Sequence, residues 1–160
     1  MINVATDSDH FKWLHLSDLH VGLTKQDWMW PSLKHLVFDD LKRVHSHTGN
    51  WDVVIFSGDL TQSGARDEFD KLDEILQELW TQFANLGFAP KLIVLPGNHD
   101  VSRPSQLKAE LRLLKRWWSE TDLHKEFFDG PPNEYQAAIL DVLNQYTEWE
   151  KKGSLQAKFR

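Results

Sequence analysis

Three short apolar runs, each followed by a polar loop with acidic or histidine side chains, constrain the fold of this chain more than any other feature. The runs are four residues long and span residues 13–16, 53–56 and 92–95. Bulky or branched apolar side chains largely fill them, and Ser, Gly or Pro closes each one. Short apolar runs bounded in this way are typical of strands buried in a parallel sheet.

The two segments between these runs have the apolar spacing of amphipathic helices. In each, apolar residues recur three or four positions apart and therefore share one helix face. They are Leu33, Val37, Leu41 and Val44 in the first segment and Phe69, Leu72, Leu76, Leu79 and Phe83 in the second. The alternation of strands and helices predicts an α/β fold with a βαβαβ parallel-sheet core.

A polar signature follows each predicted strand. The signatures are Asp18-Leu19-His20, Gly58-Asp59 and Gly97-Asn98-His99-Asp100. The loops at the carboxyl ends of strands in an open α/β sheet lie at one edge, so we expect these side chains to meet there. Carboxylate, imidazole and amide groups suit the divalent ions that activate water for phosphoryl transfer. The sequence therefore predicts a metal site at this edge.

In this order, the signatures resemble the first half of a calcineurin-like metallophosphoesterase, whose motifs read D-x-H, GD and GNH[DE]. The resemblance covers roughly residues 12–101. It implies that Asp18 and His20 bind a first metal ion. It also implies that Asp59 bridges two ions and that Asn98 binds the second. The two divalent ions expected in a complete site would be manganese, iron or zinc.

The same resemblance implies catalytic roles for His99 and Asp100. His99 would contact the phosphoryl group and support departure of the leaving oxygen. Asp100 would orient His99. The implied activity is that of a metal-dependent phosphodiesterase, a hydrolase that works through a metal-activated hydroxide.

The residues around the motifs favour two branches of this superfamily. Phosphoprotein phosphatases carry D-R-G after the GD motif and Glu after GNH, whereas Asp100 follows GNH here. The stretch GDLT at 58–61 is similar to cyclic-nucleotide phosphodiesterases, and LHLSDLHVG at 14–22 resembles DNA-repair nucleases. Both branches cleave phosphodiesters, so a nucleotide or nucleic acid is the expected substrate and the choice between the branches stays open.

The superfamily normally completes its metal site with a lone His and a G-H-x-H motif, and this sequence contains no G-H-x-H. After Asp100 it has one histidine, His124, whose surroundings predict a surface helix. Either the chain is the amino-terminal piece of a longer polypeptide, which we favour, or it is a short form that binds one metal or borrows ligands from a partner chain.

This interpretation divides the chain at residue 101. Residues 1–101 would form the metal-binding core, the first half of a two-sheet sandwich. Residues 102–160 would form a helical insertion or cap that continues into a carboxyl-terminal half. Apolar stripes within 107–118 and 135–149, separated by a Gly-Pro-Pro break, predict two helices there.

Composition narrows the classes of partner. A net charge of −6 argues against a broad electrostatic surface for DNA, and the lack of cysteine excludes disulfides and thiolate metal sites. No apolar run approaches the roughly 18 residues of a membrane span, so we expect a cytoplasmic protein without membrane contact. Eight tryptophans are present, and Trp28 and Trp30 follow the first signature. Base stacking by these two is one hypothesis, although packing is the expected role of such aromatics.

Two competing hypotheses do not require catalysis. In the first, the chain is a regulatory or assembly module derived from a metallophosphoesterase, and its tryptophan-bearing helices contact a partner. In the second, the signatures are ordinary turns in which Asp and Asn cap helices. Capping alone would not place His20 and His99 at the same sheet edge, so the metal-site interpretation is preferred.

Overall fold

The computed structural model describes residues 10–23, 29–102 and 108–152. Its centre is a parallel sheet in which the strands lie side by side in chain order. The strands are β1 (Trp13–Leu16), β2 (Val53–Phe56) and β3 (Lys91–Val94). The first two match the apolar runs of the sequence, and β3 begins and ends one residue earlier than expected.

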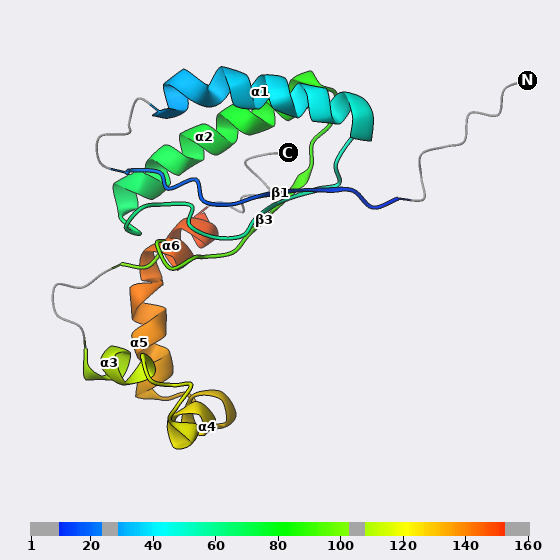
Figure 1. The fold of residues 1–160 in the computed structure, drawn as a ribbon. Coiled ribbons are helices and arrows are strands. Elements are labelled where there is room, and N and C mark those ends of the chain that lie inside the picture. The colour runs from blue at the N-terminus through cyan, green and yellow to red at the C-terminus, as the bar shows by residue number, and fades with distance from the viewer. Residues whose placement is uncertain (1–9, 24–28, 103–107, 153–160) are drawn as a thin grey trace, which may run out of the picture.

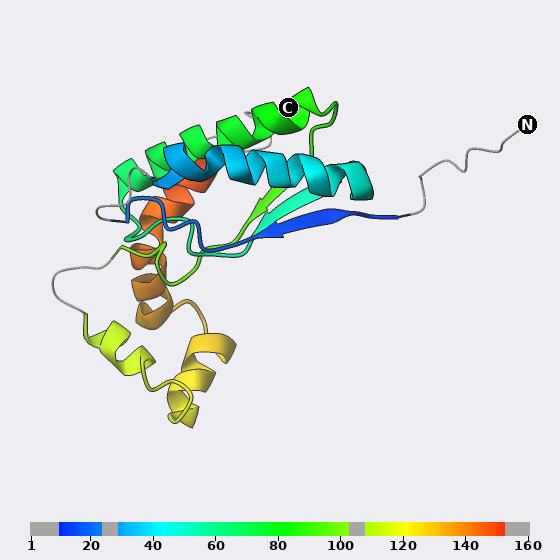
Figure 2. The same cartoon turned by 45° about the horizontal axis from the view of Figure 1, so that its top comes forward.

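Two long helices connect the strands and cover one face of the sheet. They are α1 (Met29–Thr48) and α2 (Arg66–Asn85). Figures 1 and 2 show both helices on the same side of the sheet. Each crossover between neighbouring parallel strands has the same hand. When the strands follow one another in chain order, their helices therefore lie on the same face of the sheet. The predicted α/β class and βαβαβ order are therefore confirmed.

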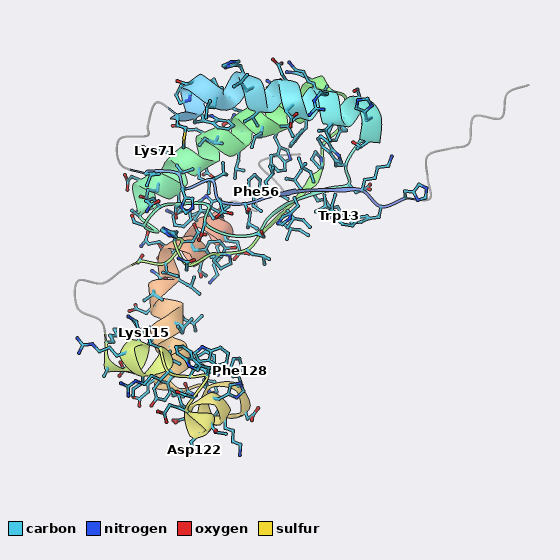
Figure 3. The ribbon with its side chains drawn as sticks, in the orientation of Figure 1. Trp13, Phe56, Lys71, Lys115, Asp122 and Phe128 are labelled. Carbon is cyan, nitrogen blue, oxygen red and sulfur yellow. The ribbon has the colours of Figure 1, made fainter. Side chains whose placement is uncertain are left out.

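The register of the sheet sorts its side chains into a covered and an open face. Leu14, Val54 and Leu92 lie opposite one another across the three strands, and they face the core under the helices. The alternate residues point the other way, and Trp13 and Ile93 are exposed on that open face. Figure 3 shows Trp13 on the side of the sheet away from α1 and α2.

After β3, the described part of the chain contains four helices, where the sequence predicted two. They are α3 (Ala109–Leu114), α4 (Thr121–Asp129), α5 (Glu134–Val142) and α6 (Asn144–Lys152). The second apolar stripe is divided at Leu143, which ends α5. Helix α4 lies between the two predicted stripes, where the sequence indicated a surface helix around His124, and its Leu123 is buried. The first residue of the earlier stripe, Leu107, lies outside the described residues.

The predicted break between the stripes is present and has a clear physical origin. Helix α4 ends at Gly130, and two prolines follow. The side chain of Asn133 then accepts a hydrogen bond of 3.0 Å from the amide of Gln136 and caps α5. Prolines cannot continue a helix, and an Asn cap satisfies the first free amides of the next one.

Helix α6 returns to the core, while α3, α4, α5 and the turns between them extend away from the sheet (Figure 1). We call this extended part, residues 108–142, the helical arm. Trp149 stacks on Phe69 of α2 with ring centroids 5.3 Å apart, and its indole nitrogen donates to the Asp73 carboxylate at 2.8 Å. The Tyr146 hydroxyl donates to the Val94 carbonyl at 3.1 Å. Burial raises the pKa of the Tyr146 phenol, and the Glu150 carboxylate adds to this effect.

Among the described residues, no helix is both long enough and apolar enough to cross a membrane.

We predict that Trp149→Ala lowers the free energy of unfolding by about 3–5 kcal/mol, because it removes a buried aromatic ring and leaves a cavity. Trp149 is 6% exposed, whereas Trp118 on the helical arm is 73% exposed. Trp118→Ala is thus the matched control and should change stability by less than about 0.5 kcal/mol. Equilibrium urea unfolding checks both; equal midpoints for the two variants would contradict the docking of α6.

Candidate metal centre

The loop after β1 is joined to the loop after β2 by backbone hydrogen bonds. The amide of Asp18 donates to the carbonyl of Gly58 at 3.2 Å, and the amide of His20 donates to the carbonyl of Asp59 at 2.9 Å. Val21 continues this pairing as an isolated parallel bridge to Thr61. The two loops therefore extend the strand pairing beyond the sheet, which holds the D-x-H and GD signatures next to each other.

The loop after β3 is joined to the same place by the carboxylate of Asp100. This side chain is fully buried at 0% exposure. It accepts hydrogen bonds from the amides of Leu60 at 3.1 Å, Thr61 at 2.7 Å and Gly97 at 2.8 Å, and from the Thr61 hydroxyl at 2.8 Å. Four such bonds satisfy the acceptor oxygens of a buried carboxylate. Asp100 thus fixes the second and third loops together.

Two glycines let these loops touch backbone to backbone. A Cβ atom on Gly97 would overlap the Asp59 carboxylate, and one on Gly58 would lie 2.9 Å from the Cα of Gly97. Gly58 also has a φ of +113°, which side-chain-bearing residues rarely adopt. The close approach allows the amide of His99 to donate to the Asp59 carboxylate at 3.0 Å.

Three of the predicted metal ligands converge at this edge. One ligand atom from each of Asp18, His20 and Asp59 lies within 4.8 Å of the others. The His20 Nε2 atom is 3.7 Å from the nearer carboxylate oxygen of Asp18. Carboxylates with an imidazole form a ligand set that suits divalent transition metals.

The backbone at these three residues is strained. The φ angles of Asp18, His20 and Asp59 are +59°, +46° and +52°, and in the described part of the chain no other non-glycine residue has a positive φ. Such conformations are sparsely populated and persist where the surroundings impose them, most often at functional sites. No local sequence pattern predicts this strain, because it depends on how the loops pair.

His20 supplies a direct test of whether a metal fits. Its Nδ1 atom is buried and has no hydrogen-bond partner. An unsatisfied buried nitrogen costs about 1–3 kcal/mol, so it is uncommon in folded proteins. The other ring nitrogen, Nε2, lies 3.7 Å from Asp18, and a ligand atom of the ring lies within 4.8 Å of both carboxylates, an arrangement that a bound cation would satisfy. The residues present therefore fit a divalent metal.

His99 lies against this cluster and is held by a residue that the sequence analysis did not single out. Its Nδ1 atom is 2.9 Å from the carbonyl oxygen of Gln62, so this nitrogen carries the hydrogen and donates. Its ring packs edge-on against that of His20 with centroids 4.7 Å apart. The Gln62 carbonyl thus holds the ring, and the Asp100 side chain bonds to the loops; the expected role of Asp100 in orienting His99 stays a prediction.

The other residues considered from the sequence occupy different places. Asn98 directly precedes His99 on the loop that contacts Asp59, and its role as a ligand stays a prediction. His124 lies on α4 in the helical arm, stacked on Trp117 with centroids 5.5 Å apart. Trp30 belongs to α1, and Trp28 lies outside the described residues.

The parallel sheet with carboxylates and imidazoles gathered at its carboxyl edge defines an α/β protein with a candidate divalent-metal site. The family model for calcineurin-like phosphoesterases matches residues 11–156. The chain therefore belongs to the calcineurin-like phosphoesterase family, whose members are hydrolases that bind divalent metals. The predicted resemblance is confirmed, and the match extends beyond the expected range into the helical arm. A comparison with curated proteins finds no match.

We predict that Asp100→Asn lowers the free energy of unfolding by about 3 kcal/mol, because an amide NH₂ would face amide donors and leave buried groups unsatisfied. Asp39→Asn is the matched control, since Asp39 is an exposed residue of α1 that pairs with Lys42, three residues along the helix. It should change stability by less than about 0.5 kcal/mol. Urea unfolding of the two variants checks the difference, and similar midpoints would argue against Asp100 as the link between the loops.

Proposed function

We propose that this chain is the metal-binding part of a phosphodiesterase that acts on nucleotides or nucleic acid. The observation that carries the proposal is the convergence of Asp18, His20 and Asp59, each held in a left-handed backbone conformation. Family membership supports the reaction type. The motif variants at 14–22 and 58–61 support a phosphodiester substrate over a phosphoprotein.

In this proposal Asp18 and His20 hold a first metal ion, Asp59 is shared between two ions, and Asn98 contributes to the second. Manganese, iron and zinc all suit such a set of oxygen and imidazole ligands. When bound, divalent ions in such a site neutralise phosphoryl charge and make water acidic enough to be a nucleophile near neutral pH. The hydrogen bond from the His99 amide keeps one Asp59 carboxylate oxygen in a fixed direction.

His99 is the proposed catalytic residue. Because its Nδ1 hydrogen is committed to the Gln62 carbonyl, its Nε2 atom is the one left for substrate. In the protonated ring Nε2 carries a hydrogen that can be donated to the departing oxygen, and in the neutral ring Nε2 accepts one. Asp100 is a positioning residue, because it holds the loops that carry Asp59 and His99.

We further propose that another polypeptide layer covers the open face of the sheet and supplies the remaining metal ligands. Parallel sheets are almost always covered on both faces, yet Trp13 and Ile93 are exposed on the face away from the helices. This layer would be a carboxyl-terminal half or a partner chain. In this arrangement residues 1–101 are the metal-binding core and residues 102–160 are a helical insertion or cap.

The same open face favours a second candidate function, a non-catalytic assembly module. Exposed apolar side chains on one face of a sheet, here Trp13 and Ile93, are a feature of contact sites. In that case the signatures would preserve the loop structure without hydrolysis, and binding of another chain would be the activity. The two candidates differ in whether the site retains metal.

The primary test is metal retention by the protein after equilibration with Mn²⁺ and dialysis, together with hydrolysis of bis(p-nitrophenyl) phosphate. We expect retained metal and hydrolysis in the wild type. Asp59→Asn should lower both by at least about 100-fold, since loss of a direct ligand exceeds the 10- to 100-fold effect of its outer partners. The control is Asp40→Asn, which removes an exposed carboxylate paired with Arg43 and should leave both unchanged.

Elemental analysis then separates the alternatives. Two ions for each chain would mean that this chain or its oligomer supplies a complete site. One ion would identify a half-site that needs ligands from the proposed additional layer. Wild-type protein that retains no metal and binds another chain tightly would contradict the enzyme and favour the assembly module.

For His99 we predict a different pattern. His99→Gln should lower kcat for the same diester by about 10²- to 10⁴-fold, the usual contribution of a general acid or base. Metal retention should stay at the wild-type level, because His99 is not among the three converging ligands. Steady-state kinetics with elemental analysis checks both. An equal loss of metal and activity would instead make His99 a ligand.

A further inference from the structure

A cavity of about 430 Å³ opens directly beside the metal centre. Asp18 and His20 form part of its wall, so it is continuous with the proposed metal site. The rest lies between the loop after β1 and the facing sides of α1 and α2. Its apolar wall includes Leu19, Val21, Trp30, Leu33, Val37 and Ile75. This volume lies within the usual range of small-molecule sites, about 300–1,000 Å³.

The walls of the cavity are held in place by polar contacts behind them. Glu78 of α2 accepts hydrogen bonds from the Trp30 indole nitrogen at 3.1 Å and from the Lys34 ammonium at 3.1 Å. Both donors belong to the first turns of α1, so Glu78 ties that end of α1 to α2. On the loop side, a Cβ atom on Gly22 would lie 2.6 Å from the Glu68 side chain, which shows how closely the loop rests on α2. The cavity is therefore preformed.

The side chains that line the cavity indicate which kind of chemical group it would bind. Among the described residues, the ionisable side chains that line it are Asp18, His20, Lys71 and Glu74. The first two belong to the metal end, and Lys71 lies on α2 near the beginning of α1 (Figure 3). The remaining wall is mainly apolar side chains. A polyhydroxylated group would leave hydroxyls unpaired against that wall, whereas a ring or other apolar group would bury apolar surface favourably.

We propose that this cavity binds an apolar organic group of the phosphoester, an aromatic ring in the simplest case, while the phosphoryl group lies at the metal ligands. The inference rests on the proposed function and deepens it, because it assigns substrate selectivity to the facing sides of α1 and α2. Leu33 is the residue whose replacement tests this proposal best. It lines the cavity yet is 41% exposed, so its replacement by a polar residue does not threaten the core.

The test compares two probes that share a head group, phenylphosphonate and methylphosphonate, by calorimetric titration of the Mn²⁺-loaded protein. Phenylphosphonate should bind at least about tenfold more tightly than methylphosphonate, since even one methylene in an apolar pocket changes affinity 10- to 200-fold. Leu33→Asp should remove this preference. Leu36→Asp is the matched control, because Leu36 also lies on α1, is 56% exposed and does not line the cavity.

The outcomes separate this inference from the proposed function. Retained metal with equal affinity for the two phosphonates overturns the cavity as a substrate pocket and leaves the metal site intact. Loss of the ring preference in both Leu33→Asp and Leu36→Asp also overturns it.

If the wild type retains no metal, the proposed function fails, and phenol at millimolar concentration tests the cavity alone. The readout is the amide chemical shifts of positions 33 and 37. Shifts that move with phenol in the wild type and in Leu36→Asp, but not in Leu33→Asp, support the cavity. Unmoved shifts in the wild type overturn it.

Discussion

The buried carboxylate of Asp100 is the interaction on which the rest of the site depends. Its four hydrogen bonds come from Leu60, Thr61 and Gly97, so one side chain joins the loops that follow β2 and β3. The loop after β1 needs no such side chain, because it pairs with its neighbour through backbone bonds. Without the carboxylate, the loops that carry Asp59 and His99 would lose its three bonds to Leu60 and Thr61 and would depend on contacts such as the bond from the His99 amide to Asp59. One buried, hydrogen-bonded side chain, together with the backbone pairing of the first loop, thus holds the three turns as one edge.

The chain order of the strands determines what the molecule presents on its two sides. Because β1, β2 and β3 lie side by side in sequence, both helices pack on one face and the other stays open. The polar loops gather at one edge for the same reason. The metal-binding edge and the open apolar face are therefore consequences of a single topology, and this is why a polypeptide that covers the face would also stand beside the site.

Sequence reasoning succeeded where local pattern and topology suffice. Apolar runs and helical stripes predicted the elements through β3, and parallel-strand geometry predicted that Asp18, His20 and Asp59 would converge. It did not reach the features that long-range packing decides. The roles of the Gln62 carbonyl and of Asp100 depend on which loop faces which, and no local pattern encodes that. The helices after β3 were undercounted because α4 is short and its apolar residues do not extend into a long stripe.

The left-handed conformation of the three ligands has a consequence for how this protein changes under selection. Each of these residues would gain about 1–2 kcal/mol if its side chain did not oppose the backbone, and glycine is the residue that removes that opposition. A screen that rewards heat resistance alone would therefore enrich glycine at positions 18, 20 and 59. The resulting protein would be more heat-resistant but would lack its predicted metal ligands. At this edge of the sheet, selection for stability and selection for metal binding therefore favour different residues.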